Sequence, residues 1–181
     1  MRKDLERIIE LPEGTTAEIE GSKITLKRNG EPASRDFGPS RIKAEISDGK
    51  IRLFVANATR RESEKIGTMH AHIKNMIKGL EKEFTYTLEI CNVHFPMNVK
   101  VEGQNIVIKS FLGETTKRIA KIVGGAKVEI SGNKISVSSR NIEAAGQTAA
   151  NIEKATKVSN GRERRIFQDG IFITEKPGRS I

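Results

Sequence analysis

The sequence repeats itself, and this internal repeat limits the possible fold more than any other feature. Glu20–Lys27 (EGSKITLK) returns as Glu102–Lys109 (EGQNIVIK), and Ala44–Ile51 (AEISDGKI) returns as Val128–Ile135 (VEISGNKI). A third, weaker echo pairs Gly67, Ala71 and Ile73 with Gly146, Ala150 and Ile152. Matches in the same order over most of the chain indicate two copies of one supersecondary unit, because a solenoid needs at least three repeats.

The first copy combines strand patterns with one helix pattern. Alternating apolar and polar residues separated by turn residues predict hairpins. The predicted strands are Ala17–Glu20, Ile24–Lys27, Ala44–Ser47 and Ile51–Ala56, with a more irregular strand region from Phe37 to Ile46. Apolar residues spaced by three or four then predict a helix from about Glu62 to Glu81.

The second copy follows the same plan and adds an extension. Its predicted strands are Thr85–Cys91, Asn98–Glu102, Ile106–Lys109, Ala126–Ile130 and Lys134–Ser138, followed by a helix capped by Asn141. Strands in hairpins followed by one helix, twice, predict an α+β fold: a tandem duplication of a small antiparallel sheet covered by one helix. We therefore expect two domains, 1–82 and 83–181, and the second carries a basic C-terminal extension.

The charge of the chain favours a polyanionic partner. The net charge is +9 and the isoelectric point is about 9.8, with basic residues in excess in both halves. Each phosphate that a lysine or arginine neutralises releases counterions, so a basic balance of this size suits nucleic acid. The chain has no Trp and a single Tyr, which argues against an interface built on large aromatic anchors.

Patterns typical of enzymes and metalloproteins are missing. The single cysteine, Cys91, excludes an intrachain disulfide, and His70 and His72 would point to different faces of a helix. No metal-ligand, phosphate-loop or nucleophile-elbow pattern appears, so we expect no catalytic residues, no metal and no cofactor. No apolar run approaches a membrane span, and the N-terminus lacks the core of a signal peptide, so a cytoplasmic protein is expected.

Two basic segments are candidates for binding phosphates. Lys117, Arg118 and Lys121 follow the turn Phe111–Gly113, whose glycine would bring the backbone close to a partner. Three arginines, Arg162, Arg164 and Arg165, lie in a stretch rich in Asn and Gly. Arginine in a polar loop can fork to phosphates and stack on exposed bases.

The C-terminal half resembles a known family. Gly146–Glu153 (GQTAANIE) and Arg164–Ile173 (RRIFQDGIFI) resemble the archaeal and eukaryotic type of ribosomal protein L6, as do Ile9–Gly14 and Phe111–Glu114. Bacterial members carry a lysine-rich Tyr-Lys-Gly-Lys-Gly motif near the C-terminus. This chain has Arg164–Gly170 instead, which indicates the archaeal type.

The resemblance implies a structural constituent of the large ribosomal subunit in the cytoplasm. Such proteins bind large-subunit rRNA mainly through the C-terminal copy, near the sarcin–ricin loop region where elongation factors dock. The implied partners are this rRNA and neighbouring ribosomal proteins, with no membrane and no small-molecule substrate. With the basic segments above, the predicted RNA-binding residues are Lys109, Lys117, Arg118, Lys121, Lys157, Asn160, Arg162, Arg164, Arg165, Lys176 and Arg179.

Two other functions stay open from the residues alone. A free RNA-binding chaperone or regulator would use the same basic surfaces away from the ribosome. An RNA-processing enzyme would need carboxylates or histidines that converge only in the folded structure.

Overall fold

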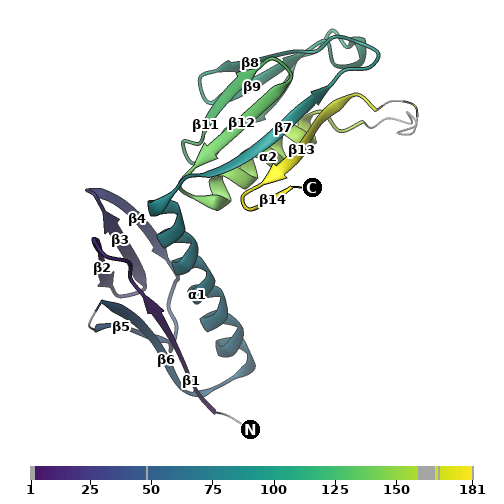
Figure 1. Cartoon of the computed structure of the whole chain (residues 1–181). Coiled ribbons are helices and arrows are strands. Elements are labelled where there is room, and N and C mark those ends of the chain that lie inside the picture. The colour runs from purple at the N-terminus through teal and green to yellow at the C-terminus, as the bar shows by residue number, and fades with distance from the viewer. Residues whose placement is uncertain (1–2, 48, 159–165, 167, 181) are drawn as a thin grey trace. The chain divides into compact units, whose positions relative to one another are not determined.

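The chain divides into two compact units, Met1–Lys82 and Glu83–Ile181 (Figure 1). This computed structural model describes residues 3–47, 49–158, 166 and 168–180. Among these residues, no helix is both long and apolar enough to cross a membrane.

The first unit consists of two small antiparallel sheets and a helix. Its described elements are, in order, β1 (Lys3–Glu10), β2 (Thr15–Glu20), β3 (Lys23–Arg28), β4 (Glu31–Asp36), β5 (Lys43–Ser47), β6 (Lys50–Ala58) and α1 (Arg60–Glu81). The sheets have the strand orders β1-β6-β5 and β2-β3-β4. Alternation along β3 and β6 buries Ile24, Leu26, Ile51 and Leu53, which form the core with α1.

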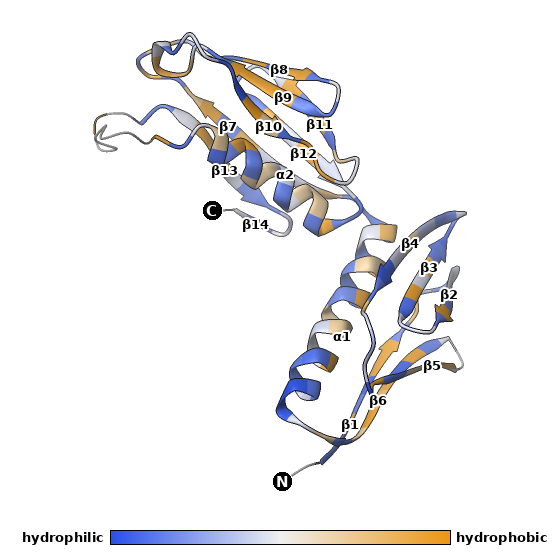
Figure 2. Ribbon diagram, turned by 180° about the vertical axis from the view of Figure 1, so that it is seen from behind, coloured by the Kyte–Doolittle hydropathy of each residue, from blue (hydrophilic) through white to orange (hydrophobic). Residues whose placement is uncertain are grey.

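Helix α1 begins at a capping box. The backbone N–H of Glu62 donates to Thr59 Oγ1 (3.4 Å), and the N–H of Thr59 donates to Glu62 Oε2 (2.7 Å). This cap starts the helix slightly before the predicted Glu62. The hydrophilic first turns of α1 are visible in Figure 2, and the buried face lies along Ile66, Met69, Ile73 and Ile77.

The second unit repeats this arrangement and extends it. Its described elements are β7 (Phe84–Cys91), β8 (Asn98–Glu102), β9 (Asn105–Lys109), the 3₁₀ turn η1 (Phe111–Gly113), β10 (Arg118–Lys121), β11 (Lys127–Ser131), β12 (Lys134–Ser139), α2 (Ile142–Ala155), β13 (Gly170–Lys176) and β14 (Arg179–Ser180). The sheets have the orders β10-β9-β8 and β11-β12-β7-β13-β14. The order β11-β12-β7 matches β5-β6-β1 of the first unit, and β13 and β14 continue the sheet beyond β7.

Helix α2 packs unusually close to its neighbours because small residues face the core. Asn141 caps it by accepting from the Glu143 N–H (2.9 Å), as predicted. The buried face contains Ala144, Ala145 and Ala149. Tyr86 of β7 lies so near Gly146 that an added Cβ would be 3.0 Å from its hydroxyl.

The predicted α+β class and duplicated sheet-plus-helix unit are confirmed, and each copy divides its strands between two sheets. The strand region expected at Phe37–Ile46 is wrong in its bounds. Asn29 and Gly30 both have positive φ (51° and 82°), so the chain turns tightly after β3 and forms β4 at Glu31–Asp36. The sequence pattern also missed the short strand β10.

Candidate nucleic-acid interface

The predicted lysines around η1 gather at one end of the β9–β10 ladder. The register pairs Arg118 with Ile108, so Lys109 and Lys117 lie at the same end of the two strands. Both side chains are exposed. Lys121 is exposed at the opposite end of β10, beside Asn105, about four residues or 13 Å along the strand.

The turn between β9 and β10 has a strained backbone and is held by two side chains that are buried in the core. Ser110, Leu112 and Gly113 all have left-handed backbones (φ 61°, 48° and 74°), a conformation costly for a residue with a side chain. Phe111 (0% exposed) and Leu112 (6%) point into the core of the unit. Their side chains fix the turn, and do not present an apolar surface to a partner.

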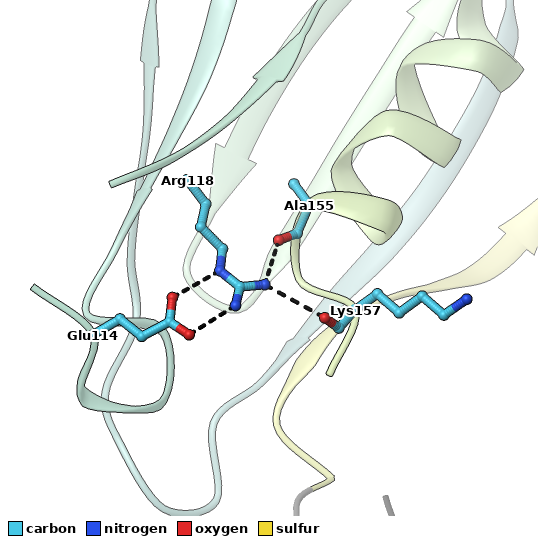
Figure 3. A network of polar contacts seen from close by, with 4 residues as sticks. All are labelled: Glu114, Arg118, Ala155 and Lys157. Atoms are coloured by element: carbon cyan, nitrogen blue, oxygen red, sulfur yellow. Dashed lines mark hydrogen bonds and ion pairs between the residues drawn. The ribbon is translucent and has the colours of Figure 1, made fainter. Parts of the chain in front are cut away.

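Arg118 is a structural clamp between this turn and the end of α2. Figure 3 shows its guanidinium between Glu114 and the carbonyls of Ala155 and Lys157. Its Nε and Nη2 donate to the two Glu114 carboxylate oxygens (2.9 and 2.8 Å), and its Nη1 donates to Ala155 O (2.8 Å) and Lys157 O (3.4 Å). The guanidinium carbon also lies 4.2 Å from the centroid of the Phe111 ring. A bidentate pair with these extra contacts has a fixed geometry, so Arg118 serves the fold itself.

The clamp places Lys157 near the η1 turn. The carbonyl of Lys157 bonds to Arg118, while its side chain is exposed. Within the described residues, no hydrogen bond or ion pair involves the ammonium groups of Lys109, Lys117 or Lys157. Lys109 and Lys117 are exposed at the strand ends that flank η1, and Lys157 is exposed with its carbonyl bonded to Arg118 and its side chain directed away from Glu114 (Figure 3). We term these three residues the lysine cluster.

A second clamp joins the β7–β8 connection to the start of β13. Asp169 is 1% exposed, and its Oδ1 accepts from the backbone N–H of His94 (2.9 Å) while its Oδ2 accepts from His94 Nδ1 (2.7 Å). Burial would raise the pKa of Asp169. The hydrogen bonds from His94 and from the Phe95 backbone outweigh burial and leave that pKa below its ordinary value.

Two further predicted residues lie elsewhere in the unit. Lys176 and Arg179 pair across the β13–β14 hairpin and are both exposed. Lys176 is at the far end of β13 from Gly170, roughly 20 Å along a strand of this length. The structure therefore does not bring these two cations into the lysine cluster.

The remaining predicted residues, Asn160, Arg162, Arg164 and Arg165, lie outside the described part of the chain. Their predicted contacts with RNA stay predictions, as do those of the described lysines.

Sequence reasoning missed both clamps. The four-residue spacing of Glu114 and Arg118 was a signal for the first, although such a spacing usually matters on a helix. The His94–Asp169 pair joins residues far apart in sequence, so no local pattern announces it. Searched over the described residues, the structure contains no group of three or more His, Cys, Asp or Glu that could hold a metal ion.

The sequence of this chain is similar to that of known proteins. Residues 95–170, which include the Arg118 clamp and Lys109, Lys117 and Lys157, match the family model described as ribosomal protein L6. The chain is 42% identical to large ribosomal subunit protein uL6 of Archaeoglobus fulgidus, over 95% of this chain and 90% of the relative. It is 43% identical to the protein of that name from Methanosarcina mazei (97% and 99% covered) and 41% identical to that from Aeropyrum pernix (97% and 98%).

These similarities, on a basic two-unit α+β fold, define the class as ribosomal proteins, which are structural components and not enzymes. Because the identity extends over nearly the whole length of archaeal relatives, the chain belongs to the ribosomal protein L6 family, of the archaeal type.

Proposed function

We propose that this protein is a structural constituent of the large ribosomal subunit and binds large-subunit rRNA mainly through its second unit. The observation that carries the proposal is the lysine cluster: Lys109 and Lys117 at the two ends of the η1 connection, and Lys157 after α2, are exposed cations beside the Arg118 clamp. Lysines of this kind bind phosphates and fix the position of a protein on folded RNA without reading its sequence. The partners are this rRNA and neighbouring ribosomal proteins of the cytoplasmic ribosome.

Within the large subunit, the proposed binding site on the rRNA is near the sarcin–ricin loop, where elongation factors dock. It is supported by the resemblance of Gly146–Glu153 and Arg164–Ile173 to the archaeal and eukaryotic L6 type. The basic residues Arg162, Arg164 and Arg165 would add phosphate contacts there, and Arg118 would act by supporting the turn that carries Lys117.

The direct test is filter binding of the full chain to in vitro transcribed large-subunit rRNA over a series of salt concentrations. Replacing Lys109 and Lys117 with Ala should weaken binding and flatten the salt dependence by roughly 0.7–0.9 per lost phosphate contact. The charge-matched control replaces the exposed Lys74 and Lys78 of α1 with Ala. Equal effects of the two double variants would contradict the assignment of binding to the second unit.

The alternative function is a free RNA-binding chaperone or regulator. Sedimentation of a cell extract distinguishes it from a ribosomal constituent. An integral constituent sediments quantitatively with the large subunit through a high-salt gradient, whereas a free chaperone stays at the top. Chemical footprinting of bound rRNA then tests the finer location, because protection away from the sarcin–ricin region would contradict it.

A further inference from the structure

An apolar groove lies where the end of α2 meets the start of β13. It has a volume of about 700 Å³, within the typical range of small-ligand pockets of about 300–1,000 Å³. Its lining residues include Cys91, Val93, Val158, Phe172, Lys154 and Lys157. We call this feature the β13 groove.

Two apolar side chains of the β13 groove are exposed. Val93 is 70% exposed and Phe172 is 43% exposed. The Phe172 ring folds back over Gly170, where an added Cβ would be 2.9 Å from the ring. The missing side chain at Gly170 therefore lets the ring lie across its own strand and line the groove. The exposed ring of Phe172 is therefore available for stacking with another molecule.

Two cations of the β13 groove can pair with phosphates. Lys154 and Lys157 are exposed. The two carboxylates in the lining are used internally: Asp169 accepts from His94, and Glu153 Oε1 accepts from the backbone N–H of Ile173 (3.4 Å). The groove thus combines the aromatic ring of Phe172 with two exposed lysines. A nucleotide has the complementary combination, an apolar base face joined to a negatively charged phosphate.

We propose that the β13 groove holds one unstacked nucleobase of the large-subunit rRNA, stacked on Phe172, with neighbouring phosphates at Lys154 and Lys157. This site rests on the proposed function and deepens it, because it adds a base contact to the phosphate contacts of the lysine cluster. Stacking on an aromatic side chain is worth about 5- to 150-fold in affinity per base and tolerates different bases.

The test compares Phe172→Ala, Phe172→Tyr and the control Val101→Ser in the same rRNA filter-binding assay. Val101 is a comparably exposed apolar residue (42%) on β8. Phe172→Ala should weaken binding about 5- to 150-fold and leave the salt slope unchanged, since it removes no charge. Phe172→Tyr should bind like the unmodified chain, and so should Val101→Ser.

A second measurement does not depend on any substitution in the groove. Cys91 is the only cysteine of the chain and lines the groove, so a maleimide reports on access to it. Burial, followed by the nearby Glu89 and Asp169, raises the pKa of the Cys91 thiol, so labelling is run at mildly alkaline pH. The bound rRNA should slow labelling at least about tenfold relative to the free protein.

The outcomes separate this proposal from the proposed function. If Lys109→Ala/Lys117→Ala flattens the salt slope while Phe172→Ala binds normally and Cys91 stays reactive, the protein binds rRNA but the groove holds no base. If neither variant changes binding, the proposed function fails as well. If rRNA leaves Cys91 reactive and only the assembled subunit protects it, a neighbouring protein occupies the groove and the proposal is overturned.

Discussion

The two units share one plan but differ at the edge of one sheet. In the first unit, β1 pairs only with β6 among the described strands, whereas its counterpart β7 pairs with both β12 and β13. Asp169 of the second clamp directly precedes the added strand, and Phe172 of the β13 groove lies in it. The extension therefore makes an edge strand of the repeated sheet an internal one in the second unit.

The largest effect on stability is expected when the packing of the added strand β13 is weakened. Ile171 of β13 is completely buried against the core of the second unit. Replacing it with Ala removes core volume and should lower the stability of that unit by about 2–5 kcal/mol. Tyr86 is the only tyrosine and the chain has no tryptophan, so denaturation followed by tyrosine fluorescence reports on the second unit.

The matched control for Ile171→Ala is Ile9→Ala on β1, where Ile9 is 2% exposed. Ile9→Ala should shift the helix signal of the first unit in circular dichroism and leave the Tyr86 transition in place. An unchanged Tyr86 transition in Ile171→Ala would show that the second unit does not need β13.

The next effect concerns the Arg118 clamp of the second unit. Arg118→Ala removes a bidentate pair whose side chains are 22% and 28% exposed, together with the contact to Phe111. We expect a loss of about 2–3 kcal/mol, between the values for exposed and buried pairs. Lys27→Ala, which breaks the exposed pair with Glu18 in the first unit, should cost less than about 1 kcal/mol.

Losses of similar size in Arg118→Ala and Lys27→Ala would mean that the clamp contributes no more than an ordinary surface pair. The rRNA affinity provides a separate readout. Because Arg118 supports the turn without presenting its charge, Arg118→Ala should weaken binding with little change in the salt slope.

Features that depend on neighbouring residues could be predicted from the sequence, whereas contacts between distant residues could not. The duplication, both helices and most hairpins follow from local periodicity and turn residues, such as the alternation in Lys23–Arg28 and the Asn141 cap. The role of Arg118 could not be predicted, because its partners Ala155 and Lys157 are distant in sequence. The β13 groove was missed for the same reason: Val93, Val158 and Phe172 meet only in the fold.

A smaller effect depends on pH and comes from Asp169. Since its pKa is lower in the folded state than its ordinary value of 3.8, the ionised form stabilises the second unit. This stabilisation is complete above the unfolded pKa and is lost as pH falls through the lower folded pKa. Asp169→Asn should reduce stability by about 1.5–3 kcal/mol at neutral pH, the scale of a hydrogen bond to a charged group.

The pH dependence distinguishes this role from simple packing. The stability difference between Asp169→Asn and the unmodified chain, followed through Tyr86, should shrink as pH drops below about 4. A difference that stays constant between neutral and acidic pH would indicate that the carboxylate charge contributes nothing.

The smallest effect compares the same position in the two helices. Gly67 of α1 and Gly146 of α2 occupy matching places in the repeat, yet an added Cβ meets nothing within 4 Å at Gly67 and lies 3.0 Å from the Tyr86 hydroxyl at Gly146. Alanine in a helix interior is favoured over glycine by about 1 kcal/mol, so Gly67→Ala should stabilise the first unit by about 0.5–1 kcal/mol. At Gly146 the same gain opposes overpacking of about 1–3 kcal/mol, so Gly146→Ala should destabilise the second unit by up to about 2 kcal/mol.

Thermal unfolding followed by circular dichroism and Tyr86 fluorescence measures the stability change of each glycine substitution. Stabilisation by both substitutions would mean that Tyr86 moves aside freely, and that α2 is no more closely packed than α1.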